Sequence, residues 1–390
     1  MATSWAITPP TGVESTHDTV ASTDVRDVSD VLDLLALKDT PLLNRLKWGS
    51  DVHNKIHSWI TEDLGPGYVI LSGQVASDAS YILIGTSGIG NITQALDQIH
   101  TGTILKSAKA ATNGYVVVEK PNNGSNSTII DFMSGTSALL TAAATMFIVG
   151  SPVNEGSSPR IDRTRERGVA SNKTMIFRED VRLTGTDMAT KYYGVANQLQ
   201  HQIEMRAIEY WRTLESAVLL SRKDAGSSTE TQVMGGVYDY LRGQSGSHID
   251  TTTTTLDEAS LNTVAAAIYD KGGSPNAFVC GSKQARQINT FDRARVRVEQ
   301  DSKVAGFNVK KYMTDLGVEL DILITRRCPA RYAFVLDLDS IDLRAMKGRK
   351  YELKKLAVTG DFVNYQLISE VTMEFRGYSF AQHGMFSALT

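Results

Sequence analysis

The sequence has few of the residues on which disulfide and metal frameworks depend. Its 390 residues include only two cysteines, Cys280 and Cys328. Two thiols cannot build a disulfide framework or a zinc cluster by themselves, so we expect both to be buried and reduced. The seven histidines are scattered, with no spacing typical of a catalytic triad. His53 and His57 lie in strand-like sequence, about 13 Å apart along it, which favours structural roles over metal binding.

Long apolar runs and an excess of positive charge are also absent. No apolar run approaches the roughly 18 residues that a membrane helix needs. The first 22 residues have neither the basic nor the apolar segment of a secretory signal. The formal net charge is −3. Proteins that bind nucleic acid mainly through their own charge are usually strongly basic, so we expect any DNA contact to be weak and local.

What remains is the composition of an ordinary globular protein. Hydrophobic residues make up 42% and charged residues 21% of the chain. At roughly 150 residues per domain, the length predicts two or three domains. Residues 1–22 are polar and rich in threonine and serine, which indicates an arm without a core of its own. An arm this short is too small for a fused scaffold domain, so we expect any scaffold to be a separate chain.

Two short helices and a strand are predicted next. Residues 25–37 carry apolar side chains at helical spacing. Pro41 can open a second helix that holds Leu42, Leu43 and Leu46. Residues 53–60 then alternate like a strand.

Strand signals dominate between about residues 65 and 160. Short β-type runs alternate with turns such as Asn113-Gly114, which is typical of a hairpin. The runs are 81–84, 103–105, 115–118, 128–132 and 146–149. We predict an inserted β domain at about residues 78–153, closed into a small barrel because single hairpins cannot bury such runs. Its predicted core consists of Val116, Val118, Ile129, Phe132, Phe147 and Val149.

Two elements further along are unusually long. Asp187 can cap a helix that begins at Met188 and continues to about Arg222, a rod of roughly 50 Å. Residues 363–376 alternate in polarity and predict one strand of roughly 45 Å, with Ile368 and Ser369 out of pattern. Between them, residues 256–336 alternate strand and helix signals, which indicates a compact α+β domain. The long elements predict a thin slab whose exposed flanks need partner subunits.

A glycine-rich turn offers an enzymatic alternative. Residues 82–90 resemble the cofactor turn of short-chain dehydrogenases, and Tyr351 and Lys355 form a Tyr-x-x-x-Lys pair. No second βαβ unit follows, and no acidic residue at a strand end is placed to hold a ribose. The sequence therefore favours a plain loop, and we expect no enzymatic activity, no cofactor and no metal.

A dense group of arginines precedes the long helix. Arg160, Arg163, Arg165 and Arg167 lie within eight residues, with two acidic residues between them. They form either a solvated surface or a clamp between subunits, because guanidinium groups bind a neighbour's carboxylates in bidentate fashion. All four are candidate intersubunit contacts.

Several blocks of the sequence resemble the major capsid proteins of tailed double-stranded-DNA bacteriophages, which share the Hong Kong ninety-seven-type capsid fold. These blocks are Asp27-Val28-Ser29-Asp30, Asp39-Thr40-Pro41-Leu42-Leu43, His57-Ser58-Trp59, residues 265–275, residues 356–361 and His383-Gly384. Their order fits over most of the chain, although no single block is specific. Ser58 stands where an acidic residue is common, and residues 377–380 are less charged than usual, which affects local contacts only.

The resemblance implies an α+β chain in four parts. They are an N-terminal arm (1–60), an extended loop (61–182) carrying the inserted β domain, a peripheral domain with a spine helix and long C-terminal strand (183–228 and 340–390), and an axial domain (229–339).

The resemblance also implies a function. The chain would self-assemble through pentamers and hexamers into an icosahedral phage head around double-stranded DNA. Portal and separate scaffold or decoration proteins would be its partners, with no membrane involved. It would be made in the host bacterial cytoplasm and reside in the virion. A nanocompartment shell of the same fold is the first alternative, and an NAD(P)-dependent oxidoreductase the second.

Overall fold

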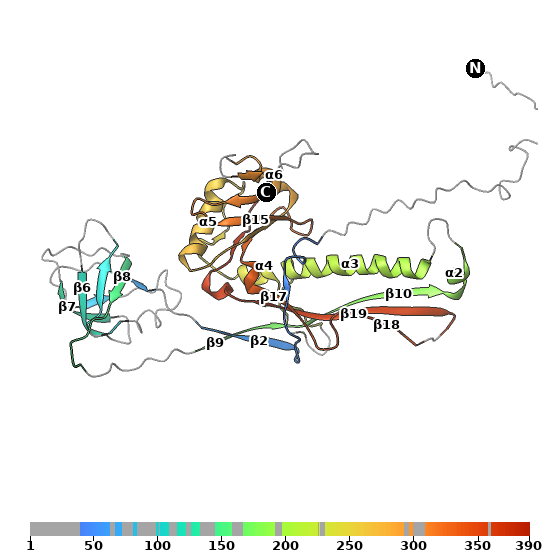
Figure 1. Ribbon diagram of the computed structural model, residues 1–390, viewed down its shortest axis with the longest axis horizontal. Helices are drawn as coiled ribbons and strands as arrows, with labels where there is room; N and C mark the ends of the chain where they lie inside the picture. The colour runs from blue at the N-terminus through green and yellow to red at the C-terminus, as the bar shows by residue number, and fades with distance from the viewer. Residues whose placement is uncertain are drawn as a thin grey trace, which may run out of the picture.

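The fold is described from a computed structural model of the chain (Figure 1). The described residues are 40–62, 67–71, 81–83, 99–100, 102–108, 115–121, 126–132, 145–157, 167–191, 197–224, 226, 231–291, 296–298, 309–357 and 360–390. The predicted helix at 25–37 and most of the glycine-rich turn, from residue 84 onward, lie outside them.

One long strand organises the first sheet. β19 (Phe362–Phe375) has 14 residues and pairs antiparallel with β10 (Met175–Thr184) over ten of them. On its other side β18 (Glu352–Lys355) and β17 (Ile341–Ala345) pair with it in succession. β1 (Lys47–Trp48) adds a parallel edge beside β17. The predicted long C-terminal strand is confirmed.

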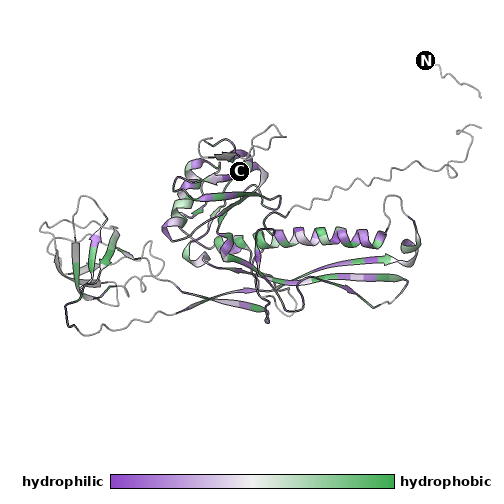
Figure 2. Cartoon of the chain, in the orientation of Figure 1, coloured by the Kyte–Doolittle hydropathy of each residue, from purple (hydrophilic) through white to green (hydrophobic). Residues whose placement is uncertain are grey.

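A helix lies along one face of this sheet (Figure 1). α3 (Gln198–Leu220) has 23 residues, and hydrophilic and hydrophobic residues alternate around it (Figure 2). At 1.5 Å per residue it spans roughly 34 Å, so the predicted rod of roughly 50 Å is wrong.

The prediction failed at the start of the helix, because two helices with separate caps replace one. The side chain of Thr184, not of Asp187, caps α2 (Gly185–Ala189) by accepting the Asp187 backbone N–H. Asn197 caps α3 by accepting the backbone N–H of Gln200. A cap satisfies the N–H groups of a first turn, and an apolar pattern does not show which of several polar residues does so.

Side chains of β19 that point toward α3 form the centre of the core. Leu367, Val371, Met373 and Phe375 are all at most 1% exposed. Ser369, which broke the polarity pattern, points to the same side of the strand as these residues. Its hydroxyl lies 2.6 Å from that of Tyr210 in α3. Two buried hydroxyls that bond to each other satisfy their hydrogen-bonding needs without water, which explains a serine at this position.

A second, seven-stranded sheet has the order β11-β20-β16-β12-β15-β14-β13. Its central strands, β12 (Ala277–Cys280) and β16 (Ala333–Leu336), are buried at every residue. Both faces are covered, by α5 (Glu258–Asp270) and α6 (Ser282–Ile288) on one side and α4 (Val237–Leu241) on the other. The remaining strands are β11 (Ile249–Asp250), β13 (Val296–Val298), β14 (Val309–Met313), β15 (Glu319–Ile324) and β20 (Gly384–Phe386).

A two-stranded ribbon leads to a third sheet set apart from the other two (Figure 1). β2 (Ile56–Thr61) and β9 (Gly168–Lys173) form this ribbon. The third sheet has six strands in the order β3-β8-β5-β6-β7-β4. They are β3 (Tyr68–Ile70), β4 (Tyr81–Leu83), β5 (Ile104–Ser107), β6 (Tyr115–Pro121), β7 (Asn126–Phe132) and β8 (Thr145–Gly150).

The five predicted strands of this region are confirmed, with two differences in their arrangement. First, β3 joins the sheet although it lies before residue 78. Second, β3 and β4 are the two ends of the strand order and do not pair with each other among the described residues, so the described strands form an open sheet and not the predicted closed barrel. Val118 is fully buried as predicted, but Phe147 and Val149 are 50% and 58% exposed. They lie on the face of β8 opposite the fully buried Met146, so their assignment to the core was wrong.

The predicted helix after Pro41 is only a single turn. The backbone N–H groups of Asn44 and Leu46 donate to the carbonyls of Thr40 and Leu42 over 3.3 and 3.1 Å, and strand β1 begins directly afterwards at Lys47. Leu42, Leu43 and Leu46 are nevertheless buried in the same cluster as Trp59 of β2, so the apolar pattern identified core residues correctly.

Candidate self-assembly surfaces

The described residues contain no group of three His, Cys, Asp or Glu side chains that could hold a metal ion. Cys280 and Cys328 are buried free thiols, as predicted. Burial raises the pKa of Cys328 to about 12 and that of Cys280 further, which keeps both as unreactive thiols. No described helix is long and apolar enough to cross a membrane.

The Tyr-x-x-x-Lys pair of the enzymatic alternative is split by its packing. The ring of Tyr351 stacks on Trp211 of α3 at a centroid distance of 5.4 Å and lies 5.2 Å from Tyr210. Burial raises the pKa of Tyr351, the opposite of what proton transfer at neutral pH requires. Lys355 is exposed at the end of β18. These contacts give Tyr351 a packing role.

Of the four candidate arginines, the structure describes only Arg167; Arg160, Arg163 and Arg165 lie outside the described residues. The Arg167 Nε atom is 3.7 Å from a carboxylate oxygen of Glu62, and the two side chains are 68% and 50% exposed. An ion pair this exposed contributes about 0–1 kcal/mol. Arg167 can therefore exchange Glu62 for another carboxylate at little loss.

A buried carboxylate fastens the ribbon to the long strand. Glu374 of β19 is 6% exposed, and one of its oxygens lies 2.9 Å from His57 Nε2 of β2. The same oxygen lies 2.6 Å from Arg344 Nε of β17. A carboxylate removed from water needs such partners, so the three side chains hold strand and ribbon at one position.

A second buried carboxylate, four residues earlier in β19, has a similar set of partners. Glu370 accepts a hydrogen bond from Thr174 Oγ1, just after β9, and one from Arg349 Nη1, each over 2.7 Å. Asn172 of β9 adds a bond from Nδ2 to the carbonyl of Met373 over 2.7 Å. The alternation of the sequence correctly put Glu370 and Glu374 on the same face of the strand. It did not predict that this face is buried at both residues. No sequence signal shows that His57 and Thr174 lie opposite them.

The ribbon has one buried and one exposed face. Trp59 and its cross-strand partner Ala170 are both 7% exposed. On the opposite face Ile56, Ile60 and Val169 are 49%, 66% and 71% exposed, with Ile60 and Val169 paired across the strands. Apolar side chains aligned on one exposed face are typical of a surface that a partner covers.

The outer edge of β10 is a second exposed feature. Among the described strands β10 pairs only with β19, so its other edge is open. Arg178 and Asp180 form an ion pair of 3.1 Å, and the guanidinium of Arg182 lies 3.5 Å above the Phe362 ring. Charged side chains along an open edge oppose indiscriminate strand addition, which leaves the edge to a specific neighbour.

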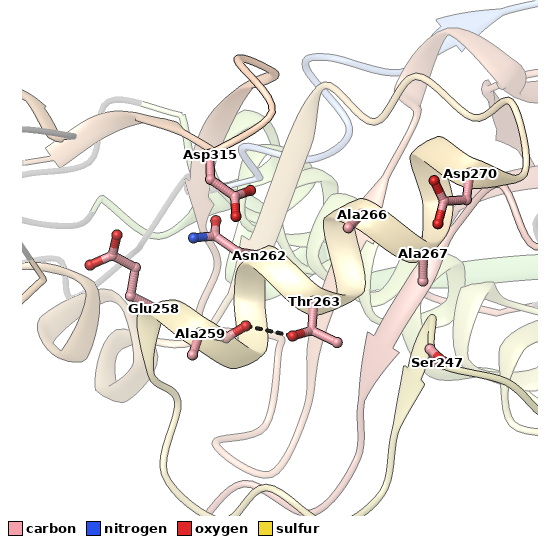
Figure 3. A pocket seen from close by; sticks show the side chains of 9 residues that line it. All are labelled: Ser247, Glu258, Ala259, Asn262, Thr263, Ala266, Ala267, Asp270 and Asp315. Carbon is pink, nitrogen blue, oxygen red and sulfur yellow. Dashed lines mark hydrogen bonds between the residues drawn. The ribbon is translucent and has the colours of Figure 1, made fainter. Parts of the chain in front are cut away.

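A groove of about 710 Å³ runs along the exposed side of α5 (Figure 3). Its floor consists of small side chains, among them Ala259, Thr263, Ala266 and Ala267. The remaining residues of its lining are Ser247, Glu258, Asn262, Asp270 and Asp315. Three of these are carboxylates and none is basic, so the groove is acidic.

Comparisons with known proteins agree with this picture of a building block. Residues 10–390 match the family described as SU10 major capsid protein. A major capsid protein of Escherichia phage Phieco32 is 23% identical over 286 residues, covering 60% of this chain and 80% of that protein.

Two solved structures show the same fold. The capsid of a native GTA particle matches with a TM-score of 0.51, at 10% identity, over 97% of this chain and 100% of that one. The capsid of Myoviridae phage XM1 matches with a TM-score of 0.50, also at 10% identity and over 97% and 100%. The fold is therefore the Hong Kong ninety-seven-type capsid fold that the sequence blocks implied. Because the family match spans nearly all residues, the chain belongs to the SU10 major capsid protein family and has a structural role in a phage capsid.

Proposed function

We propose that copies of this chain assemble through pentamers and hexamers into an icosahedral head that encloses double-stranded DNA. The exposed face of the ribbon carries this proposal. Ile56, Ile60 and Val169 are half or more exposed on a ribbon that is fastened at its root by Glu374. A rigidly held apolar face with no cover of its own is suited to lie on a neighbouring copy.

The parts of the chain take the roles that the family resemblance implies. We assign residues 1–60 to an N-terminal arm, 61–182 to the extended loop, 183–228 with 340–390 to the peripheral domain, and 229–339 to the axial domain. The ribbon β2–β9, the long sheet with α3 and the seven-stranded sheet support these assignments.

Partners other than the chain itself follow from the same proposal. The head needs a portal, and scaffold or decoration proteins act as separate chains. DNA contacts the inner face weakly, because the net charge is −3. Synthesis takes place in the host bacterial cytoplasm, and the product resides in the virion.

The test is to express the chain and examine the particles by negative-stain microscopy. We expect closed icosahedral shells with pentamers at the vertices and hexamers between them. Particles isolated from infected cells should show the absorbance of packaged nucleic acid, whereas a nanocompartment shell would contain protein cargo instead. Soluble monomers under all assembly conditions would contradict the proposal.

The four candidate arginines provide a finer test. Replacing Arg160, Arg163, Arg165 and Arg167 by serine should leave soluble subunits or capsomers but prevent closure of the shell, because contacts between charged groups across an interface are lost. Normal heads from this variant would show that the arginines are ordinary solvated surface.

A further inference from the structure

Two passages of the chain connect the seven-stranded sheet with the sheet of the long strand. Residues 337–340 lead from β16 to β17, and residues 376–383 lead from β19 to β20. We call these two passages the joint. The seven-stranded sheet stands above β19 in Figure 1. A change in the angle between the two sheets must therefore bend the joint.

One buried side chain bonds to both passages. His383 is fully buried, and its Nδ1 accepts the backbone N–H of Asp337 over 3.2 Å. Its Nε2 lies 2.8 Å from the carbonyl of Arg376 and 3.2 Å from the hydroxyl of Ser340. That hydroxyl donates to the carbonyl of Asp337 over 2.8 Å, so it is free to accept from the ring. A single imidazole thus holds the two passages together.

These partners fix the protonation state of the ring. Because Nδ1 faces the N–H of Asp337, the hydrogen of the neutral ring lies on Nε2, where two acceptors surround it. The charged ring has a second hydrogen on Nδ1, directed at another donor. Two donors cannot bond to each other, so the closed joint accommodates only the neutral form.

Positive groups near His383 add to this penalty. His248, directly before β11, is a second buried imidazole, and its Nε2 has no hydrogen-bond partner among the described residues. Burial and, after it, the charge of Lys271 at the end of α5 lower the pKa of His248. The guanidinium of Arg376 is paired with Asp342 over 3.0 Å. A proton on His383 therefore has buried or positive neighbours on this side.

The acidic neighbour does not offset the charge. Asp337 offers His383 only its backbone N–H, while its carboxylate accepts the N–H of Asp339 over 3.0 Å. Burial raises the pKa of Asp337, which makes it a weaker counter-ion. Tyr378, in the same passage as His383, stays neutral because burial raises its pKa too.

The second passage also contains a strained residue. Ala381 has a φ of 58°, and it is the one residue other than glycine with a left-handed backbone in the described parts of the chain. A side chain in this conformation is held there by its surroundings at a cost in energy. Release of the passage removes this strain, which favours an opened joint.

We propose that the joint is a hinge that opens locally when His383 takes up a proton, which frees the seven-stranded sheet to change its angle to the long sheet. The proposal concerns the single subunit and goes beyond its assembly into a head.

The size and sign of the effect follow from linkage. In an opened joint His383 is in water with an ordinary pKa of about 6.5, whereas burial lowers the pKa in the closed joint to about 4. Above pH 6.5 neither state binds the proton, and below pH 4 both do. Between these values acid favours the open state. Through His383 alone the ratio of open to closed joints should rise about 30-fold from pH 7.5 to pH 5.

Amide hydrogen exchange of unassembled subunits, read by mass spectrometry and corrected for the intrinsic rate at each pH, measures this ratio. Peptides of the joint should be less protected than those of β12 and β16, because a local opening needs less energy than unfolding of the subunit. Their protection should fall at least about 30-fold from pH 7.5 to pH 5. Joint peptides as protected as the two central strands would overturn the proposal, because the joint would then open only with the whole subunit.

A histidine variant links the fall to one side chain. His383→Asn can keep an acceptor for the Asp337 N–H but cannot become charged, so about 30-fold of the fall should disappear. The control His53→Asn makes the same exchange at an exposed histidine outside the joint and should keep the wild-type fall. An equal fall in His383→Asn and wild type would refute the hinge.

The wild-type profile decides the question if His383→Asn does not fold. Its fall in protection must take place between about pH 6.5 and pH 4, and a fall that begins only below pH 4 contradicts the proposal. Neither measurement requires closed shells, so a failure of the hinge is distinguishable from a failure of head assembly.

Discussion

The two parts of β19 lie in different surroundings, although both alternate in polarity apart from Ile368 and Ser369. We call residues 367–375, next to the ribbon, the near half and residues 362–366 the far half. Residues 367–375 are buried throughout, whereas residues 362–366 are only half-buried. The near half lies between α3 and the root of the ribbon, and its carboxylates Glu370 and Glu374 have partners inside the protein. The charged residues paired with the far half, Asp180 opposite Gln366 and Arg182 opposite Asn364, are exposed. The near half thus holds the subunit together, while the far half and its flanks are available to neighbours.

The largest expected difference between the halves comes from removing a buried charge. Glu374→Gln leaves Arg344, 18% exposed, without its counter-ion and should lower the free energy of unfolding by about 3–5 kcal/mol. The matched change Asp180→Asn, opposite Gln366 in the far half and in an exposed pair with Arg178, should cost about 0–1 kcal/mol. Urea unfolding of unassembled subunits measures both. Equal losses in the two variants would show that the buried charges of the near half do not stabilise the subunit more than the exposed ones.

Acid should weaken the near half next most strongly. His383 is buried, its Nδ1 accepts the backbone N–H of Asp337, and its Nε2 lies 2.8 Å from the carbonyl of Arg376. Its ring is 4.3 Å from Phe375 at the end of β19. Burial is the main cause that lowers the pKa of His383 to about 4, with a smaller contribution from His248 and a partial opposing effect of the bond to the Arg376 carbonyl. Protonation would place a hydrogen on Nδ1 and break the bond from Asp337.

The direction of the pH effect follows from the lowered pKa. Above pH 6.5 His383 is neutral in the folded and the unfolded chain. Between about pH 6.5 and 4 only the unfolded chain takes up the proton, so stability falls by about 3 kcal/mol in total and then levels off. His383→Asn should remove this part of the slope. His248, whose pKa is also lowered by burial, is present in both proteins and cancels. Identical slopes from unfolding at several pH values would contradict the assignment.

A matched pair of valines tests the comparison within one strand. Val371 is fully buried, and Val371→Ala should cost about 2–3 kcal/mol for the lost methyl groups and the resulting cavity. Val363 is half-buried in the far half, so Val363→Ala should lower the free energy of unfolding by less than about 1 kcal/mol. Denaturant midpoints of the subunits measure the pair. In assembled particles the Val363→Ala penalty should grow if a neighbour covers the far half, and an unchanged value would argue that no neighbour does.

The smallest expected effect is at the N-terminal cap of α3. Asn197→Ala removes the acceptor for the Gln200 N–H and should cost about 1 kcal/mol. Asn197→Ser keeps an acceptor and should cost only a few tenths of that. Thermal unfolding of the two variants checks the cap. A loss from alanine no greater than from serine would mean that the helix does not begin at this residue.

The sequence alone identified the core-forming face of β19. A strand repeats every two residues, so Leu367, Val371 and Met373 had to share a side wherever the strand lay. Short apolar runs between turn residues located the strands of the third sheet, and the presence of only two cysteines indicated that Cys280 and Cys328 are buried and reduced. The order of the sequence blocks indicated the family.

What the sequence did not show depends on contacts between distant residues. The break between α2 and α3 was missed because Thr184, Asp187 and Asn197 are all good caps, and only the folded backbone selects two of them. The exposure of Phe147 was missed because an isolated strand has no inner face until a sheet and its neighbours define one.

The burial of Glu374, where the ribbon meets β19, is the clearest feature that depends on tertiary packing. Glu374 has the alternation of a solvent-facing residue, and its sequence neighbours give no reason to bury it. It is buried because His57, 317 residues earlier, and Arg344 of β17 meet it there and offset the loss of water. Local periodicity therefore determined which residues face the same way. Only the packing of ribbon, sheet and helix decided which of those faces became interior and which were left for a partner.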